Sequence, residues 1–406
     1  MNTVAPNKMA SDKAISIKTV SGKTVSGKTV SGKSAVGKSI LNKSVLGKAV
    51  VNKEYALFCL TEGGMALARR LQSHLAIDCF TSPELLESEF MDADSGFMAF
   101  EDGFASTVRK AFIQYSALIM IGATGIAIRV IAPLLKDKMT DPAVVVLDEK
   151  GQFAISLLSG HMGGANELAQ QIADILDGQA VITTATDVNH VAALDLLSQQ
   201  IDGEMENFRA NVKTVNQMLV NGKRVGIWWH PSLRCEKDRY DTRGFIPVDA
   251  LDDQPELDAL VYVSYERINL ALAIPTFKLI PRRIVAGIGC RRGVEAERLA
   301  ELLDRHLAEY GLEPLALKAV GSIELKKAEP ALIQLTEKRQ IPFQIFSVNQ
   351  LAQCEQAFPA SEFVRKTVGI GCVSQPVAWL MSQGHLVGHT LREQGVTITL
   401  GVLHPC

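Results

Sequence analysis

The sequence predicts an α/β protein with three consecutive α/β units and mostly parallel sheets, preceded by a disordered lysine-rich tail. From residue 54 onward, short apolar runs typical of buried strands alternate with amphipathic segments at helical spacing. The first 53 residues instead repeat a short motif that separates no apolar face from a polar one. We expect a tail over 1–53, an N-terminal domain over 54–190, a small central domain over 191–281 and a C-terminal domain over 282–406.

The tail places a lysine at every fifth position from Lys8 to Lys53, as in KTVSGKTVSGK. Five residues advance a helix by about 140°, so these lysines would line no single face. The repeat also matches the phosphate-loop pattern GxxxxGK[ST] three times, first at 22–29. A phosphate loop needs a strand before it and a helix after it, and here the repeat occupies both flanks. A solvated basic arm is therefore favoured over a nucleotide site.

Composition limits the possible partners. Residues 1–53 hold ten lysines against one acid, Asp12, a balance of +9, so residues 54–406 carry −11 of the total charge of −2. An acidic body argues against nucleic-acid binding. No apolar run reaches the roughly 18 residues that span a bilayer, and no secretory pattern opens the chain, so we expect a cytoplasmic protein without membrane contact. Seven scattered cysteines without CxxC spacing predict reduced thiols and no metal site of the protein's own.

The elements follow in order along the body. The first unit opens with the strand YALFCLT, a glycine turn and a helix, and continues with the strand-like runs ALIMIG, AVVVLDE, FAISLL and VITTAT. The central unit is helical from ALDLLSQQ to VNQMLVNG, and RVGIWWH and DALVYVSYE then favour strands. Two prolines in PTFKLIPRR indicate a linker. The last unit contains the strand IVAGIGC, a long helix, PLALKAVGSIE, a helix near 326–338, and the strands IPFQIFS and VTITLGVL.

The octapeptide SGHMGGAN stands where the strand FAISLL meets the helix ANELAQQIADIL. The carboxyl ends of strands in an open sheet form a ligand crevice, and a helix N-terminus there offers N–H groups to anions. His161 suits proton transfer near neutrality, although it could merely tie the turn together. Gly163 and Gly164 permit close approach of a ligand or serve packing. Asn166 is an N-cap or a substrate contact, and Ser159 is a hydrogen-bonding group because the GxSxG elbow is absent.

Two other strand ends are expected at the same crevice. Thr124 and Gly125 follow ALIMIG, and Arg129 lies one turn further on, where it could bind a carboxylate or form an ordinary surface ion pair. Thr184 and Asp187 follow the strand AVI, and Asp187 could orient His161 if the two meet in space.

The last unit offers a second polar turn, GIGCRRG. Its glycine spacing is one residue off the dinucleotide fingerprint, so NAD binding is discounted. Arg291 and Arg292 precede a helix start, which favours an anion. Cys290 beside them is the rival nucleophile, as a thiolate of low pKa. Lys326 and Glu329 have helical i, i+3 spacing and form either a simple surface pair or part of a site.

The long run from GATGIAIRV through SGHMGGANELA to VITTATD resembles the cobalt-precorrin-5A hydrolase (CbiG-type) family of anaerobic cobalamin biosynthesis. The EGG turn, GIGCRRG and SIELKKAE resemble other parts of the family, so the resemblance runs from about residue 54 to the end and is weakest over 191–280. One departure is Gln375, which stands where the resemblance leads us to expect Glu.

The resemblance implies a hydrolase that opens the δ-lactone of cobalt-precorrin-5A, a polycarboxylated tetrapyrrole, and releases acetaldehyde to leave cobalt-precorrin-5B. It implies no cofactor, because the cobalt is carried by the substrate. We expect His161 and Asp187 to be catalytic. We expect the substrate to be bound by Thr124, Gly125, Arg129, Ser159, Gly163, Gly164, Asn166, Thr184, Arg291, Arg292, Lys326 and Glu329. The alternative is a non-catalytic carrier of corrin intermediates. A homodimer and transient contacts with neighbouring pathway enzymes stay open as partner hypotheses.

Overall fold

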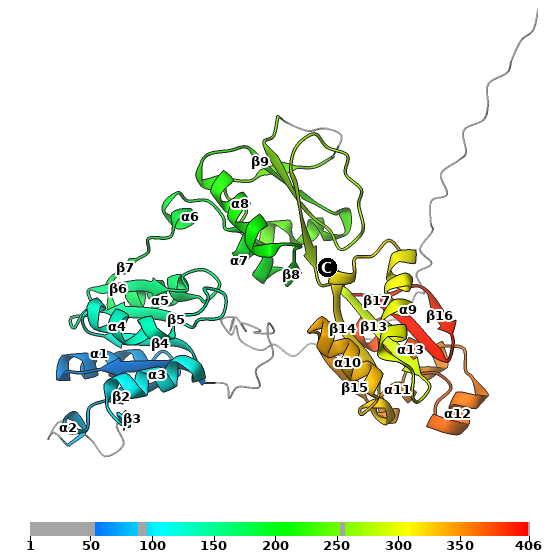
Figure 1. Cartoon of the computed structure of the whole chain (residues 1–406), viewed down its shortest axis with the longest axis horizontal. Helices are drawn as coiled ribbons and strands as arrows, with labels where there is room; N and C mark the ends of the chain where they lie inside the picture. Colours follow the sequence, from blue (N-terminus) through cyan, green and yellow to red (C-terminus); the bar gives the residue numbers. More distant parts are fainter. Residues whose placement is uncertain (1–52, 88–95, 252–255, 405–406) are drawn as a thin grey trace, which may run out of the picture. The chain divides into compact units, whose positions relative to one another are not determined.

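The computed structural model describes residues 53–87, 96–251 and 256–404. Within them the chain forms three α/β units, each built on its own sheet (Figure 1). This confirms the predicted fold class of three consecutive units with mostly parallel sheets. The predicted tail lies outside the described residues, except for Lys53, which begins the first strand.

The first unit contains a seven-stranded sheet in the order β3-β2-β1-β4-β5-β6-β7. Its strands are β1 (Lys53–Cys59), β2 (Ile77–Thr81), β3 (Phe97–Ala99), β4 (Tyr115–Ile121), β5 (Ala143–Leu147), β6 (Phe153–Leu158) and β7 (Gln179–Val181). The strands β1 to β5 run parallel, whereas β6 is antiparallel to β5 and β7 is parallel to β6. The carboxyl ends of β6 and β7 therefore lie at the edge opposite to those of β1 to β5.

Helices cover both faces of this sheet (Figure 1). On one face α1 (Glu62–Gln72) and α5 (Ala165–Leu176) pack against the strands, and on the other α3 (Phe104–Gln114) and α4 (Thr124–Ile131) do. Shorter elements are α2 (Pro83–Leu86), η1 (Ala132–Leu134) and α6 (Ala185–Val188). Because every residue of β5 is buried, this strand reads in the sequence as a continuous apolar run.

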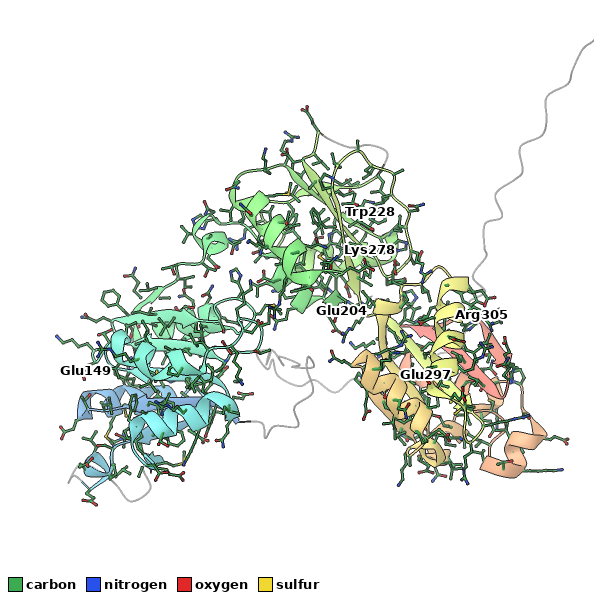
Figure 2. The ribbon with its side chains drawn as sticks, viewed as in Figure 1. Glu149, Glu204, Trp228, Lys278, Glu297 and Arg305 are labelled. Atoms are coloured by element: carbon green, nitrogen blue, oxygen red, sulfur yellow. The ribbon has the colours of Figure 1, made fainter. Side chains whose placement is uncertain are left out.

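The central unit has a five-stranded sheet in the order β10-β9-β11-β12-β8. Its elements are α7 (Leu194–Gln200), β8 (Gly203–Glu204), α8 (Phe208–Val220), β9 (Val225–Trp229), η2 (Pro231–Arg239), β10 (Ile246–Val248), β11 (Ala259–Val263) and β12 (Thr276–Pro281). Figure 2 labels Trp228 on β9 and Lys278 on β12. The expected linker is wrong, because TFKLIP forms β12, in which Phe277, Leu279 and Ile280 are buried. Pro275 directly precedes this strand and Pro281 is its last residue.

The C-terminal unit has a five-stranded sheet in the order β15-β14-β13-β17-β16, in which β17 is antiparallel to β13 and β16. Its strands are β13 (Ile284–Cys290), β14 (Leu317–Ile323), β15 (Phe343–Phe346), β16 (Leu386–Glu393) and β17 (Val396–Val402). The helices are α9 (Ala296–Glu309), η3 (Pro314–Ala316), η4 (Glu324–Lys326), α10 (Pro330–Arg339), α11 (Val348–Ala352), η5 (Glu355–Ala357), α12 (Glu362–Val368) and α13 (Ser374–Met381). Across the described ranges, no helix is long and apolar enough to cross a membrane.

Candidate active site

The loop between β6 and α5 is wound tightly on itself. Ser159 has a φ of 57° and Gly164 a φ of 87°, both in the left-handed region. A Cβ added to Gly163 would lie 2.3 Å from the Ser159 Cβ, so only glycine fits there. The N–H groups of Ala165 and Asn166 donate to the carbonyls of Ser159 and Gly160 over 3.2 and 3.0 Å. The first two backbone N–H groups of α5 are therefore already hydrogen-bonded within the loop. This contradicts the prediction that they are available to an anion.

Asn166 does not cap the helix, which corrects the N-cap interpretation. The cap position is Gly164, which forms no side-chain capping bond. The Asn166 Oδ1 instead accepts from the Ser156 hydroxyl at 2.6 Å, and its Nδ2 donates to Thr184 Oγ1 at 2.8 Å and to Asp187 Oδ2 at 3.0 Å. One carboxamide thus connects β6 with the segment that follows β7, and it fixes the Asp187 carboxylate in place.

His161 lies between two carboxylates. Its Nε2 is 3.0 Å from Asp187 Oδ2 and 2.9 Å from Thr186 Oγ1, and its Nδ1 is 3.4 Å from Asp195 Oδ2. The His161 and Asp195 side chains are 12% and 10% exposed, whereas the Asp187 side chain is 41% exposed. The structure therefore brings the two predicted catalytic residues, His161 and Asp187, into contact, with solvent access on the Asp187 side.

The charge state of this cluster follows from its neighbours. Burial lowers the pKa of His161, but hydrogen bonds and charge attraction from Asp195 and Asp187 outweigh burial and raise the pKa above its ordinary value. Burial raises the pKa of Asp195, and its contacts with His161 and Asn216 more than offset this and lower the pKa. The two shifts agree, since each describes an imidazolium paired with a carboxylate. Both shifts favour the charged forms of the two groups in contact.

Asp195 is the residue of the cluster that the sequence did not reveal. It lies in the first turn of α7, where its Oδ1 accepts from Asn216 Nδ2 at 3.1 Å, and Asn216 Oδ1 in turn accepts from the Leu194 N–H at 2.8 Å. Its local sequence, ALDLLSQQ, reads as an ordinary amphipathic helix. Only the fold shows that this carboxylate meets an imidazole 34 positions earlier in the chain.

Thr124, Gly125 and Arg129 lie at the other edge of the first sheet, which corrects the expectation of a single crevice. The Ser159 hydroxyl donates to the Asp141 carbonyl at 3.0 Å, just before β5 begins, so the His161 loop lies beside the amino end of β5. Thr124 begins α4 after the carboxyl end of β4, which runs parallel to β5. The antiparallel pairing of β6 is the physical reason for the separation.

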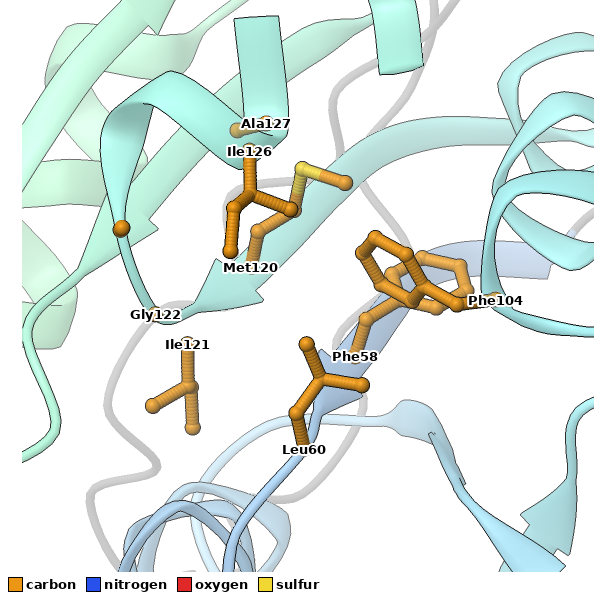
Figure 3. A pocket seen from close by; sticks show the side chains of 9 residues that line it. Phe58, Leu60, Phe104, Met120, Ile121, Gly122, Ile126 and Ala127 are labelled. Carbon is orange, nitrogen blue, oxygen red and sulfur yellow. The ribbon is translucent and has the colours of Figure 1, made fainter. Parts of the chain in front are cut away.

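The edge near Thr124 is apolar rather than polar. Figure 3 shows a shallow hollow there between β1, β4 and the start of α4. Its lining consists of Phe58, Leu60, Phe104, Met120, Ile121, Gly122, Ala123, Ile126 and Ala127. Ile126 and Ile128 of α4 are 44% and 47% exposed. This edge holds no group for proton transfer in its lining, although it offers apolar surface.

In the C-terminal unit, Arg291 and Arg292 are exposed directly after β13. The adjacent Gly293 N–H donates to Glu329 Oε1 at 3.1 Å, and Lys326 Nζ donates to Glu329 Oε2 at 2.6 Å. The Glu329 side chain is only 5% exposed, so the Lys326–Glu329 pair is not a simple surface pair. Burial raises the pKa of Glu329, but Lys326 and the Gly293 amide outweigh it and lower the pKa. The pair anchors the arginine turn to the segment after β14.

The cysteines do not support a nucleophilic role. Burial raises the pKa of Cys290 to about 11, so the rival interpretation of a reactive thiolate is wrong. Among the described residues, free thiols are carried by Cys59, Cys79, Cys290, Cys354 and Cys372.

Gln375 lies in the first turn of α13, and its Oε1 accepts from Arg392 Nη2 at 3.4 Å. A glutamate there would form an ion pair with Arg392, whereas the carboxamide keeps the hydrogen bond without the charge.

Comparison with known proteins relates all three units to proteins of cobalamin biosynthesis. Family models match residues 106–187 (cobalamin synthesis G, N-terminal), 192–280 (cobalamin biosynthesis, central region) and 284–401 (cobalamin synthesis G, C-terminus). The chain is 57% identical to the cobalt-precorrin-5A hydrolase of Salmonella typhimurium over 86% of its own length and 97% of that protein. It is 30% identical to the cobalt-precorrin-5A hydrolase of Priestia megaterium, with coverages of 86% and 95%. A solved cobalamin biosynthesis protein G homologue from Sulfolobus solfataricus aligns with a TM-score of 0.33 and 17% identity, with coverages of 86% and 97%.

Proposed function

Because this chain belongs to the cobalt-precorrin-5A hydrolase family, we propose that it hydrolyses the δ-lactone of cobalt-precorrin-5A and releases acetaldehyde to give cobalt-precorrin-5B in cobalamin biosynthesis. The single observation that carries this proposal is the 57% identity over 97% of the Salmonella hydrolase. All three units take part in that match, which spans 349 residues. The cobalt arrives with the tetrapyrrole, and the proposal requires no further cofactor.

The reaction divides into two stages with separate proton demands. Water adds to the ester carbonyl, and the ring oxygen leaves with a proton, which gives a free carboxyl group and a hydroxyl on the former bridging carbon. The hydroxyl then loses its proton, the bond from its carbon to the macrocycle breaks, and acetaldehyde departs while the electron pair stays with the macrocycle. A proton donor near the lactone oxygen and an acceptor near the water are therefore required.

His161 is the proposed donor. Its raised pKa favours the imidazolium, and the departing ring oxygen needs a proton. Donation from Nε2 requires its contact with Asp187 Oδ2 to be exchanged for one with the substrate, while Asn166 still holds that carboxylate, whose side chain is 41% exposed. Asp195 on the other nitrogen is 10% exposed and stays in place to orient the ring.

Asp187 is the proposed acceptor for the attacking water. Its Oδ2 is held by His161 and Asn166, and no residue in the described ranges donates to its Oδ1. One oxygen thus holds the carboxylate, and the other is left to accept a proton from water. The remaining residues of the loop, Ser159, Gly163, Gly164 and Thr184, would shape the surface on which the lactone ring rests.

The carboxylates of the substrate require cationic partners on the protein. Arg291 and Arg292 are the first candidates for this role. Neither guanidinium forms an ion pair with any residue that the structure describes, and both are exposed. Arginine binds carboxylates in a bidentate manner, so two free guanidinium groups on one turn suit a polycarboxylated ring.

Acetaldehyde release from purified cobalt-precorrin-5A tests the function directly. We expect stoichiometric acetaldehyde and a contracted corrin product with the full chain, and neither product with buffer alone. If the chain bound the corrinoid but released no acetaldehyde, a non-catalytic carrier of corrin intermediates would replace the hydrolase.

A further inference from the structure

Two elements of the C-terminal unit bring three possible metal ligands together outside the candidate active site. His306 and Glu309 lie one turn apart on α9, the helix on which Figure 2 labels Arg305. His389 lies on β16, at the edge of the C-terminal sheet. One ligand atom from each of the three residues can be chosen so that all lie within 4.8 Å of one another.

The distances within this group suit a small cation. Glu309 Oε2 is 3.1 Å from His306 Nδ1, and Glu309 Oε1 is 3.6 Å from His389 Nε2. Two nitrogen or oxygen ligands bound at about 2.0–2.1 Å to a tetrahedral Zn²⁺ lie about 3.3 Å apart. The two observed separations, one from each oxygen of Glu309, lie on either side of that value.

A second observation is the burial of His306, whose side chain is 0% exposed. Its Nδ1 faces Glu309 Oε2, so Nδ1 is the ring nitrogen that would bind the ion.

The arrangement of His389 is also fixed. Its Nδ1 contacts the Tyr310 hydroxyl, and its backbone N–H donates to the same hydroxyl at 2.9 Å. Gly388, with a φ of 61°, allows this approach, because a Cβ there would lie 2.0 Å from the Tyr310 ring. Metal-bound histidines commonly hold their other ring nitrogen in such a hydrogen bond.

We propose that His306, Glu309 and His389 form a binding site for a divalent transition-metal ion of the Zn²⁺ class, which links α9 to the edge strand β16. Two imidazoles and one carboxylate are a common zinc ligand set, with water in the fourth position. No motif in the sequence reveals it, because 80 residues separate the third ligand from the second. The site concerns an ion held by the protein and is independent of the cobalt in the tetrapyrrole.

Metal titration of the full chain, prepared without a histidine tag, tests this proposal. We expect one equivalent of Zn²⁺ to bind by calorimetry, one equivalent of Co²⁺ to give the visible absorption of a four-coordinate ion, and Zn²⁺ to raise Tm. Absence of stoichiometric Zn²⁺ binding in the wild-type chain would overturn the proposal.

Substitution of the two exposed ligands tests metal binding without disturbing the folded core. His389 and Glu309 are 61% and 46% exposed, so His389→Ala and Glu309→Gln should fold normally and bind Zn²⁺ more than about 100-fold more weakly, since even outer partners contribute 10–100-fold. The matched control is His74→Ala, an exposed histidine that contacts only Ser73 and the Arg70 carbonyl. Equal loss in His74→Ala, or undiminished affinity in His389→Ala, would contradict the assignment.

Discussion

Two polar regions of the molecule differ in the sign of their charge and in how their groups are paired. The His161 cluster, consisting of His161, Asp187 and Asp195, holds one imidazole between two carboxylates. The arginine turn, consisting of Arg291 and Arg292, presents two exposed guanidinium groups, neither of which forms an ion pair with a described residue. In the first region the charged groups are paired with one another, and in the second the guanidinium groups are available to bind a ligand.

The difference separates proton transfer from substrate binding. A cluster with more carboxylates than imidazoles repels a polyanion, so its carboxylates serve to set the pKa of His161 rather than to attract the substrate. The arginine turn offers two guanidinium groups that suit carboxylates, so it attracts the substrate rather than transferring a proton to it. Changes in the first region should therefore lower kcat, and changes in the second should raise KM.

The largest effect is expected for His161→Asn. The carboxamide retains a donor of similar size but cannot transfer a proton, so kcat for acetaldehyde release should fall by about 10²–10⁴-fold. Binding of the corrinoid, measured by its visible absorption during titration, should change little. Normal turnover by this variant would contradict the division between the two regions, because the proton donor would then have to be a residue other than His161.

An intermediate effect is expected for Asp187→Asn. The substitution removes one of the two carboxylates that raise the pKa of His161 and also removes the proposed acceptor for water, so kcat should fall by about 10²-fold. A donor must be protonated, so activity is present below the folded-state pKa of His161 and is lost as the pH rises through it.

The pH profile of this variant distinguishes a catalytic from a purely structural role. Without the Asp187 charge, the alkaline limb of the kcat/KM profile should move to lower pH, since a neighbouring opposite charge favours the charged imidazolium. The control variant is Asp174→Asn on α5. Asp174 accepts a hydrogen bond from Gln170, so its substitution should leave the alkaline limb of the profile in place. An unchanged limb in Asp187→Asn would mean that His161 is not the group that titrates.

The fold could be read from the sequence where burial dictates the pattern. The strand AVVVL is apolar throughout because every residue of β5 is buried, and α5 is recognisable from its apolar stripe. The antiparallel direction of β6 leaves no such signal, because strand direction depends on pairing rather than on local pattern. For this reason the sequence placed Thr124 and His161 in one crevice, whereas the structure puts them at opposite edges.

The site was predictable in part for a related reason. Glycines and a histidine at a strand-to-helix turn mark a local feature, but the sequence offered the pairing of His161 with Asp187 only as a possibility, and the structure shows the contact. Asp195 and Asn216 come from helices whose sequences are indistinguishable from ordinary amphipathic ones. Their role depends on tertiary contacts, which a single sequence does not encode in readable form.

The smallest effect is expected for the double variant Arg291→Ala/Arg292→Ala, compared with Arg129→Ala. Charge-assisted bonds to substrate carboxylates, reduced by solvent exposure, should contribute roughly tenfold to KM, with kcat unchanged because the contacts are the same in the ground and transition states. The increase should shrink as salt rises, since exposed charges are screened. Arg129 is equally exposed but lies at the apolar edge of the first sheet, so Arg129→Ala should change KM by no more than about twofold. If both variants raised KM equally, carboxylate binding would extend to the edge near Thr124, and the division between the two regions would have to include a third surface.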